Sequence, residues 1–192
     1  MSPDSTKIAS GSEDGRTACV WSLSTGQRLL GPSWEHNRSV FAVKFSPDGR
    51  FIATATVWGS ILIYDSQDGS RLVDVPVKVT YSLNHSLVWS SNCKHLFVVY
   101  SSKIICLDAS TGATLSQWSW TVHDELNHIA LASDGAFIAA SSSSSVLFWD
   151  AATHEQIGSA IEHTGKVKCM ATSTNNDIVI GGDEKNHTSQ SL

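Results

Sequence analysis

The sequence predicts an all-β fold that repeats one four-stranded antiparallel unit. Short apolar runs rich in β-branched and aromatic residues alternate with tight polar turns, the pattern of antiparallel strands joined as a meander. No long stretch has the 3.6-residue periodicity of an amphipathic helix. The same order of strand and turn signals returns about every 43 residues along the 192-residue chain.

The clearest repeated feature is an apolar run that ends in an anchor residue and is followed by a polar turn. The anchors are Trp21, Tyr64, Leu107 and Trp149, and they are separated by 43, 43 and 42 residues. Five residues after the anchors come Gly26, Gly69, Gly112 and His154. A second series contains "SPDS" at 2–5, "SPDG" at 46–49, "ASDG" at 132–135 and the weaker "SSNC" at 90–93. Since the series share one period, the chain consists of internal repeats.

The second repeat shows each expected element in order. Residues 40–46 are expected to form a first strand, which "PDG" then ends in a turn. Residues 51–56 and 60–65 form the second and third strands, since both are short, apolar and β-branched. After the turn "SQDG", residues 71–75 form the fourth strand.

This set of features resembles the WD40 repeat, in which each repeat is one blade of a β-propeller. The resemblance rests on the period, the aromatic-Asp pair at Trp149 and Asp150, the "SPDG" turn and an upstream His. It implies an incomplete propeller of about 4.5 four-stranded blades over residues 1–182, followed by a tail at 183–192 that is expected to be disordered. The expected repeats are 1–33, 34–76, 77–120, 121–161 and a truncated 162–182.

Two phrases, "GQRLLGPSWEHNRSV" and "HEQIGSAIEHTGKV", look like WD40 arrays of fungal NTPase-type signalling proteins. Repeats one, two and four match the WD40 pattern specifically, whereas repeat three is degenerate.

The resemblance also implies a hydrogen-bonded lock within each blade. Its members are a His before the first strand, a Ser or Thr in the second, an Asp in the next turn and the Trp of the third strand. The residues expected to serve as locks are Asp14, Trp21, His36, Tyr64, His123, Trp149 and His163. Since no repeat has the whole set, blade stability is expected to rest mainly on packing.

Composition disfavours several functional classes. The net charge is −5 and no run of five Lys and Arg residues occurs, so neither nucleic acid nor an anionic membrane is an expected partner. No apolar stretch approaches the length of a membrane span, and the start lacks the pattern of a signal peptide, so a cytoplasmic rather than secreted protein is predicted. The four cysteines form no CxxC pair, which gives no signal for zinc or redox chemistry.

The sequence gives no signal for catalysis. It has no GxSxG motif, and its eight histidines lack metal-ligand spacing, so no catalytic residue, cofactor or metal is predicted. Three aspartates that follow anchors are expected to fix the next turn by local hydrogen bonds. They are Asp65, Asp108 and Asp150.

Aromatic residues in the connections are the candidates for partner binding. Trp34 and Trp120 fall on or near connections between blades, and Trp58 lies in the turn between the second and third strands. The resemblance implies that both kinds of connection open on one face, where Arg38 supplies a polar contact. The alternative is that these tryptophans pack between blades or cover a sheet edge.

The predicted function is therefore a non-catalytic scaffold that binds other proteins or peptides. One alternative is a ligand- or peptide-sensing array split from a fungal NTPase-type signalling protein, and a less favoured one is a propeller hydrolase. A closed ring of about seven blades needs roughly 300 residues. Three arrangements are open: a piece of a larger propeller, which is preferred; self-association through exposed terminal strand edges; and a small ring in which residues 167–181 pair with the N-terminal strands.

Overall fold

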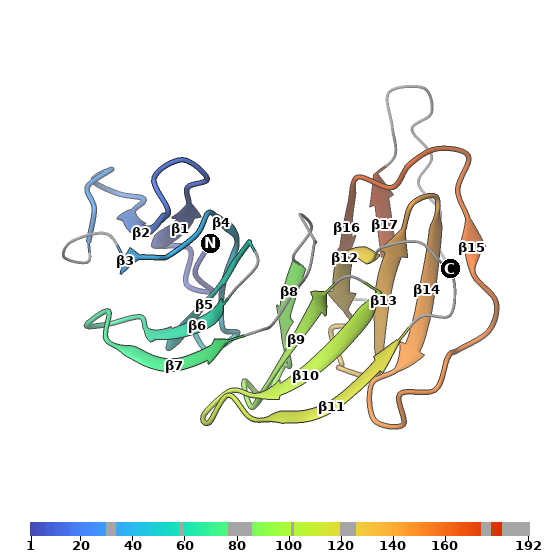
Figure 1. Ribbon diagram of the computed structural model, residues 1–192. Coiled ribbons are helices and arrows are strands. Elements are labelled where there is room, and N and C mark those ends of the chain that lie inside the picture. The colour runs from blue at the N-terminus through green and yellow to red at the C-terminus, as the bar shows by residue number, and fades with distance from the viewer. Residues whose placement is uncertain are drawn as a thin grey trace.

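The computed structural model describes residues 1–29, 34–57, 60–76, 86–100, 102–119, 126–173 and 178–181. In these ranges the chain forms seventeen strands and no helix, so the all-β prediction is confirmed. The strands build five antiparallel sheets, which follow one another along an open arc (Figure 1). The fold is therefore that of an incomplete β-propeller whose sheets are its blades. The predicted tail at 183–192 lies outside the described residues.

The sheets follow the order of the chain. The first sheet holds β1 (Lys7–Gly11), β2 (Thr17–Ser22) and β3 (Trp34–Glu35). The second holds β4 (Val40–Phe45), β5 (Phe51–Thr56), β6 (Ser60–Asp65) and β7 (Arg71–Pro76). The third holds β8 (Ser86–Trp89), β9 (His95–Tyr100), β10 (Lys103–Asp108) and β11 (Thr114–Ser119). The fourth holds β12 (Leu126–Leu131), β13 (Phe137–Ser142), β14 (Ser145–Asp150) and β15 (Ile161–Glu162), and the fifth holds β16 (Cys169–Thr172) and β17 (Ile178–Gly181).

Sheets and sequence repeats are out of phase by one or two residues. Trp34 and Glu35 pair with β2 and complete the first sheet, although the repeat boundary assigned them to the second repeat. Glu162 likewise pairs with Ser145 and belongs to the fourth sheet rather than to the fifth repeat. The physical reason is that an outer strand leads directly into the inner strand of the next sheet, so a periodic sequence carries no mark of where one sheet ends.

The repeated turn at the start of each blade is held by one hydrogen-bond pattern. The Ser46 hydroxyl donates to the Asp48 carboxylate (2.6 Å) and accepts from the Phe51 N–H (2.9 Å), while the Gly49 N–H donates to the Ser46 carbonyl (2.9 Å). Gly49 has φ of 73°, in the left-handed region that favours glycine. The residues at the equivalent position also have positive φ: Ser5, Cys93 and Gly135.

The turn after each third strand is fixed by an aspartate. Asp65, Asp108 and Asp150 accept the backbone N–H two residues on, at 2.7, 2.9 and 2.9 Å, which confirms the prediction from sequence. The Ser110 hydroxyl and nearby backbone N–H groups lower the pKa of Asp108 to about 2, because they stabilise the carboxylate.

The apolar core lies between consecutive sheets. Each adjacent pair of sheets shares one buried cluster. The middle strands are therefore covered on both faces, and β6, β9 and β14 each have four consecutive buried residues. This explains why their sequences are continuous apolar runs instead of alternating patterns.

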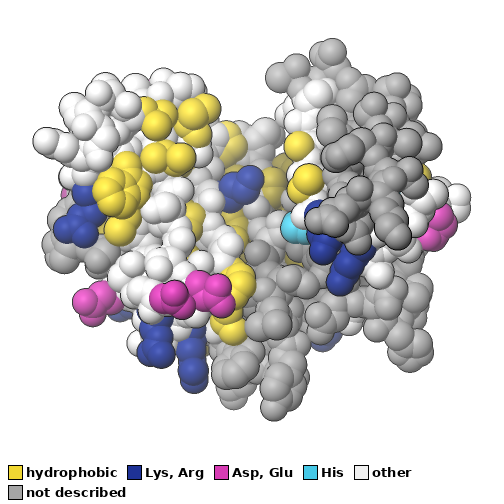
Figure 2. All heavy atoms as spheres, turned by 90° about the horizontal axis from the view of Figure 1, so that it is seen from above, with side chains coloured by type: hydrophobic (Ala, Val, Ile, Leu, Met, Phe, Trp, Pro, Cys, Tyr) yellow, Lys and Arg dark blue, Asp and Glu magenta, His cyan; other side chains and the backbone are white. Residues whose placement is uncertain are grey.

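The first sheet lies at the N-terminal end of the arc, and one of its faces is open. Ile8 and its cross-strand partner Trp21 are 41% and 37% exposed. The equivalent pair in the second sheet, Ile52 and Tyr64, is 0% and 4% exposed, since the first sheet packs on it. Figure 2 shows apolar side chains gathered on this N-terminal side of the molecule.

The described strands do not close into a small ring. β16 pairs with β17, β1 pairs with β2, and the described residues show no ladder between these two sheets. The small-ring arrangement is therefore not the one found in the described part of the chain. In the same ranges, no helix is long and apolar enough to cross a membrane.

Candidate interaction surface

Two kinds of loop meet on one edge of the arc. The loop at 12–16 joins β1 to β2 in the first sheet, and the loop at 36–39 leads from β3 into β4 of the second sheet. The His36 N–H donates to the Arg16 carbonyl (2.8 Å), and the Val40 N–H donates to the Ser12 carbonyl (3.1 Å). These bonds place both kinds of loop side by side, and we call this edge the connection face.

The same arrangement recurs in the fourth blade. There the His163 N–H donates to the Ser144 carbonyl (2.7 Å), and the Val167 N–H donates to the Ser143 carbonyl (2.8 Å). The connection face is therefore built from backbone bonds that do not depend on the loop side chains, so the loop sequences are free to vary.

Trp34 packs between the first two sheets. Its ring is stacked on Tyr64, with centroids 4.1 Å apart and planes 7° apart, and its Nε1–H donates to the Gly69 carbonyl (2.9 Å). This geometry corresponds to the packing alternative considered for Trp34. A docking role remains a prediction and would have to be additional to this contact.

Of the other three candidates for partner binding, Arg38 is among the described residues and the two tryptophans are not. Arg38 is exposed in the loop at 36–39, on the connection face. Trp58 and Trp120 lie outside the described residues, so their roles stay predictions from sequence.

His36 is the centre of the best-formed lock. Its Nδ1–H donates to the Trp34 carbonyl (2.8 Å), which leaves Nε2 as an acceptor. The Thr54 hydroxyl donates to Nε2 at 3.0 Å, and the Tyr64 hydroxyl lies 3.4 Å from the same atom. Burial lowers the pKa of His36 and raises the pKa of Tyr64 to about 12, so both side chains are neutral near pH 7.

The remaining predicted lock residues are less completely assembled. Trp21 donates from Nε1 to the Ser10 hydroxyl (2.9 Å), whereas Asp14 is exposed and lies outside that pair. In the fourth blade Trp149 is 4% exposed, and the buried Ser141 hydroxyl has no partner among the described residues.

Two histidines complete the predicted set. The Gly165 N–H donates to His163 Nδ1 (3.2 Å), which is a contact within the loop, and His123 lies outside the described residues.

The comparisons with known proteins agree with this architecture. The family model "WD domain, G-beta repeat" matches residues 28–65 and 114–150. Each match runs from an outer strand, or just ahead of one, through the third strand of the next sheet. These two stretches of the chain match WD40 repeats.

The chain is also similar to individual proteins over parts of their length. The chain is 26% identical to "Kinesin-like protein KIF21A" of Homo sapiens over 183 residues, which are 94% of this chain and 10% of that protein. It is 32% identical to "Small ribosomal subunit protein RACK1" of Caenorhabditis elegans over 113 residues, 55% of this chain and 34% of the relative. It is 30% identical to "WD repeat-containing protein 1" of Bos taurus over 101 residues, 52% and 15% of the two chains. The chain thus spans between a tenth and a third of the length of these relatives.

One contact between neighbouring blades was not predicted from the sequence. His154 occupies the position where the other blades have glycine, and its φ of 62° is in the left-handed region. Its ring is stacked on Trp118 of the preceding blade, with centroids 4.1 Å apart and planes 12° apart, and its Nε2 lies 3.4 Å from the Ser116 hydroxyl. The signal was the substitution of a repeated glycine, but the partner is revealed only by how the sheets pack.

The described residues bear on two kinds of chemistry, metal binding and thiol reactivity. Within the described ranges, no group of three or more His, Cys, Asp or Glu side chains could hold a metal ion. Burial raises the pKa of Cys106, which disfavours the reactive thiolate. The prediction that the chain needs no cofactor remains a prediction.

Proposed function

We propose that the chain acts as a non-catalytic scaffold that binds other proteins through its WD40 blades. The observation that carries the proposal is the connection face, where loops from neighbouring blades are tied together by backbone hydrogen bonds. WD40 repeats generally serve as interaction scaffolds and not as enzymes, and this supports the same role here. A rigid framework that presents variable loops is the usual basis of protein recognition.

The electrostatics of this face suit a polar protein surface. Glu13, Asp14, Arg16 and Arg38 are all exposed on the adjoining loops, so charges of both signs lie close together. Such mixed charge favours a partner with complementary polar groups, and it gives specificity more than raw affinity.

A charge reversal on the connection face tests the scaffold role. Proteins captured from a cell extract by the immobilised chain are compared for wild type, Arg38→Glu and Lys94→Glu. Lys94 is the matched control, because it is also an exposed cation but lies in the turn between β8 and β9, at the opposite end of the strands.

We expect Arg38→Glu to weaken capture by about tenfold or more, as for an interfacial arginine worth about 1.4 kcal/mol or more. Lys94→Glu should capture as wild type does. Equal capture by both variants, or no capture above bare resin, contradicts the proposal.

The relation to fungal NTPase-type signalling proteins remains a separate prediction. It rests on the two sequence phrases at 26–40 and 154–167. Sequencing the flanking gene tests it, because a sensor of that kind predicts an encoded nucleotide-binding segment upstream. The predicted cytoplasmic location is to be checked by cell fractionation.

A further inference from the structure

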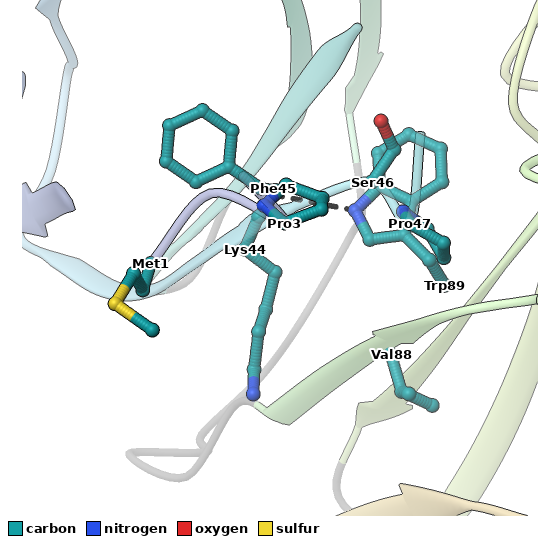
Figure 3. A pocket seen from close by; sticks show the side chains of 8 residues that line it. All are labelled: Met1, Pro3, Lys44, Phe45, Ser46, Pro47, Val88 and Trp89. Atoms are coloured by element: carbon teal, nitrogen blue, oxygen red, sulfur yellow. Dashed lines mark hydrogen bonds between the residues drawn. The ribbon is translucent and has the colours of Figure 1, made fainter. Parts of the chain in front are cut away.

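A pocket of about 200 Å³ lies between residues of the first three blades (Figure 3). It adjoins the end of β4, whereas the connection face adjoins the start of that strand. It is open to solvent and is lined by the N-terminal residues Met1 and Pro3, by the end of β4 with the turn that follows, and by β8. Its lining includes Met1, Pro3, Lys44, Pro47, Val88 and Trp89. No element of the connection face contributes to it, so it is a distinct surface.

The walls of the pocket are fixed by packing and by a hydrogen bond. The Trp89 Nε1–H donates to the Lys44 carbonyl (3.2 Å) and joins β8 to β4. The Trp89 ring is also stacked against Phe51, with centroids 6.2 Å apart. Pro3 packs so closely on Gly49 that an added Cβ there would lie 3.3 Å from Pro3 Cδ. These contacts hold the Trp89 and Pro3 parts of the pocket wall in place.

Lys44 gives the pocket its chemical character. It is the only lining residue with a charged side chain, and the described residues offer its ammonium group no hydrogen bond or ion pair. Figure 3 shows the Lys44 side chain extending between Met1 on one side and Val88 on the other. A carboxylate that pairs with Lys44 would therefore have apolar surface on both flanks.

The size of the pocket limits what can occupy it. Pockets for drug-sized ligands and cofactors usually have volumes of about 300–1,000 Å³. At about 200 Å³ this pocket suits one or two side chains of a peptide better than a cofactor.

We propose that the pocket binds an extended segment of a partner protein in which a Glu or Asp lies between apolar residues. The carboxylate accepts hydrogen bonds from the Lys44 ammonium group, and the flanking side chains contact Met1 and Val88. An acid within a segment fits better than a terminal carboxylate, because apolar surface lies on both sides of the lysine. The proposal rests on the scaffold function and adds the partner chemistry of a second surface.

The test uses two synthetic peptides and protein with isotope-labelled methyl groups. The peptides are acetyl-Gly-Leu-Glu-Leu-Gly-amide and its counterpart with Gln in place of Glu. Titrations followed by NMR report on the methyl groups of Met1 and Val88 for wild type, Lys44→Gln and Lys103→Gln. Lys103 is the matched control, since it is exposed on β10 and does not line the pocket.

We expect the Glu peptide to shift both methyl signals and to bind wild type about fivefold more tightly than the Gln peptide does, which corresponds to about 1 kcal/mol. Lys44→Gln should remove that preference, whereas Lys103→Gln should keep it. Unchanged melting temperatures show that the variants remain folded. Comparing the Glu and Gln peptides on wild-type protein tests the carboxylate of the peptide without any change to the protein.

Three results would overturn the proposal: equal affinity of wild type for both peptides, no shift at Met1 and Val88, or tighter binding of a peptide whose only carboxylate is at its C-terminus. Each of these would leave the capture experiment on the connection face unaffected, so failure of the pocket and failure of the scaffold role are distinguishable.

Discussion

Replacing His154 by Gly and by Ala separates the backbone strain at this position from the value of its ring contacts. A residue other than glycine in the left-handed region costs about 1–2 kcal/mol. The stack on Trp118 contributes about 0.5–1.5 kcal/mol, and the long contact to Ser116 about 0.5 kcal/mol. The ring contacts therefore offset the strain approximately, which explains how a histidine is tolerated where the other blades have glycine.

His154→Ala loses the contacts and keeps the strain, so we expect it to lower the free energy of unfolding by about 1–2 kcal/mol. His154→Gly also loses the contacts but relieves the strain. After subtracting the greater freedom of glycine in the unfolded chain, the Gly variant should be about 0.5–1 kcal/mol more stable than the Ala variant. The expected order of stability is wild type, then Gly, then Ala.

Urea unfolding followed by circular dichroism measures these differences, and Trp118→Leu completes a double-mutant cycle. We expect a coupling of about 1 kcal/mol between His154 and Trp118, because they touch across a blade boundary. If the Ala variant equals or exceeds the Gly variant in stability, the strain argument is wrong. If the cycle is additive, the stack contributes nothing.

Three further predictions concern stability and assembly. Burial lowers the pKa of His36, so below about pH 6.5 the unfolded state binds more protons than the folded state does. The melting temperature should therefore fall as the pH is lowered from 7.5 to 5.5, and His36→Gln should reduce that fall. Gly112→Ala should lower the free energy of unfolding by about 3 kcal/mol or more, because the added Cβ would lie 2.6 Å from a Val75 methyl group. Gly26 has open space around it, so Gly26→Ala should lower the free energy of unfolding by only about 1–2 kcal/mol. Denaturant unfolding measures both. If the chain self-associates through its exposed N-terminal sheet, light scattering should show a mass that rises with concentration, and Ile8→Glu should suppress the rise; a constant monomer mass would argue against it.

The strands and turns could be predicted because their causes are local. In the second blade the predicted strands agree with the structure to within one residue at each end, since short apolar runs are bounded by turns that their own side chains hold. Even the weak match "SSNC" forms the expected turn. Ser90 and Asn92 supply the same side-chain bonds as Ser46 and Asp48, although Cys93 replaces the glycine.

Contacts between blades were harder to predict, because they depend on how sheets pack. The second strand of this blade contains both Thr54 and Thr56, and only the pairing of strands brings the Thr54 hydroxyl to the His36 imidazole. The sequence also indicated no partner for His154, since Trp118 lies 36 residues earlier and on another sheet. The site candidates Trp58 and Trp120 lie outside the described residues, so their roles rest on the sequence alone.

The phase difference between repeat and sheet has an evolutionary consequence. The stretch at 28–65, one unit of the family, contains Trp34 from the outer strand of one blade together with Thr54 and Tyr64 from the next. Trp34 stacks on Tyr64, and its carbonyl accepts from His36, so both partners of the junction lie in one unit. Duplication of such a unit therefore copies a junction and not an isolated sheet. An inserted copy brings the contacts that join it to its neighbour, and arrays of this kind can gain or lose units without having to evolve a new interface each time.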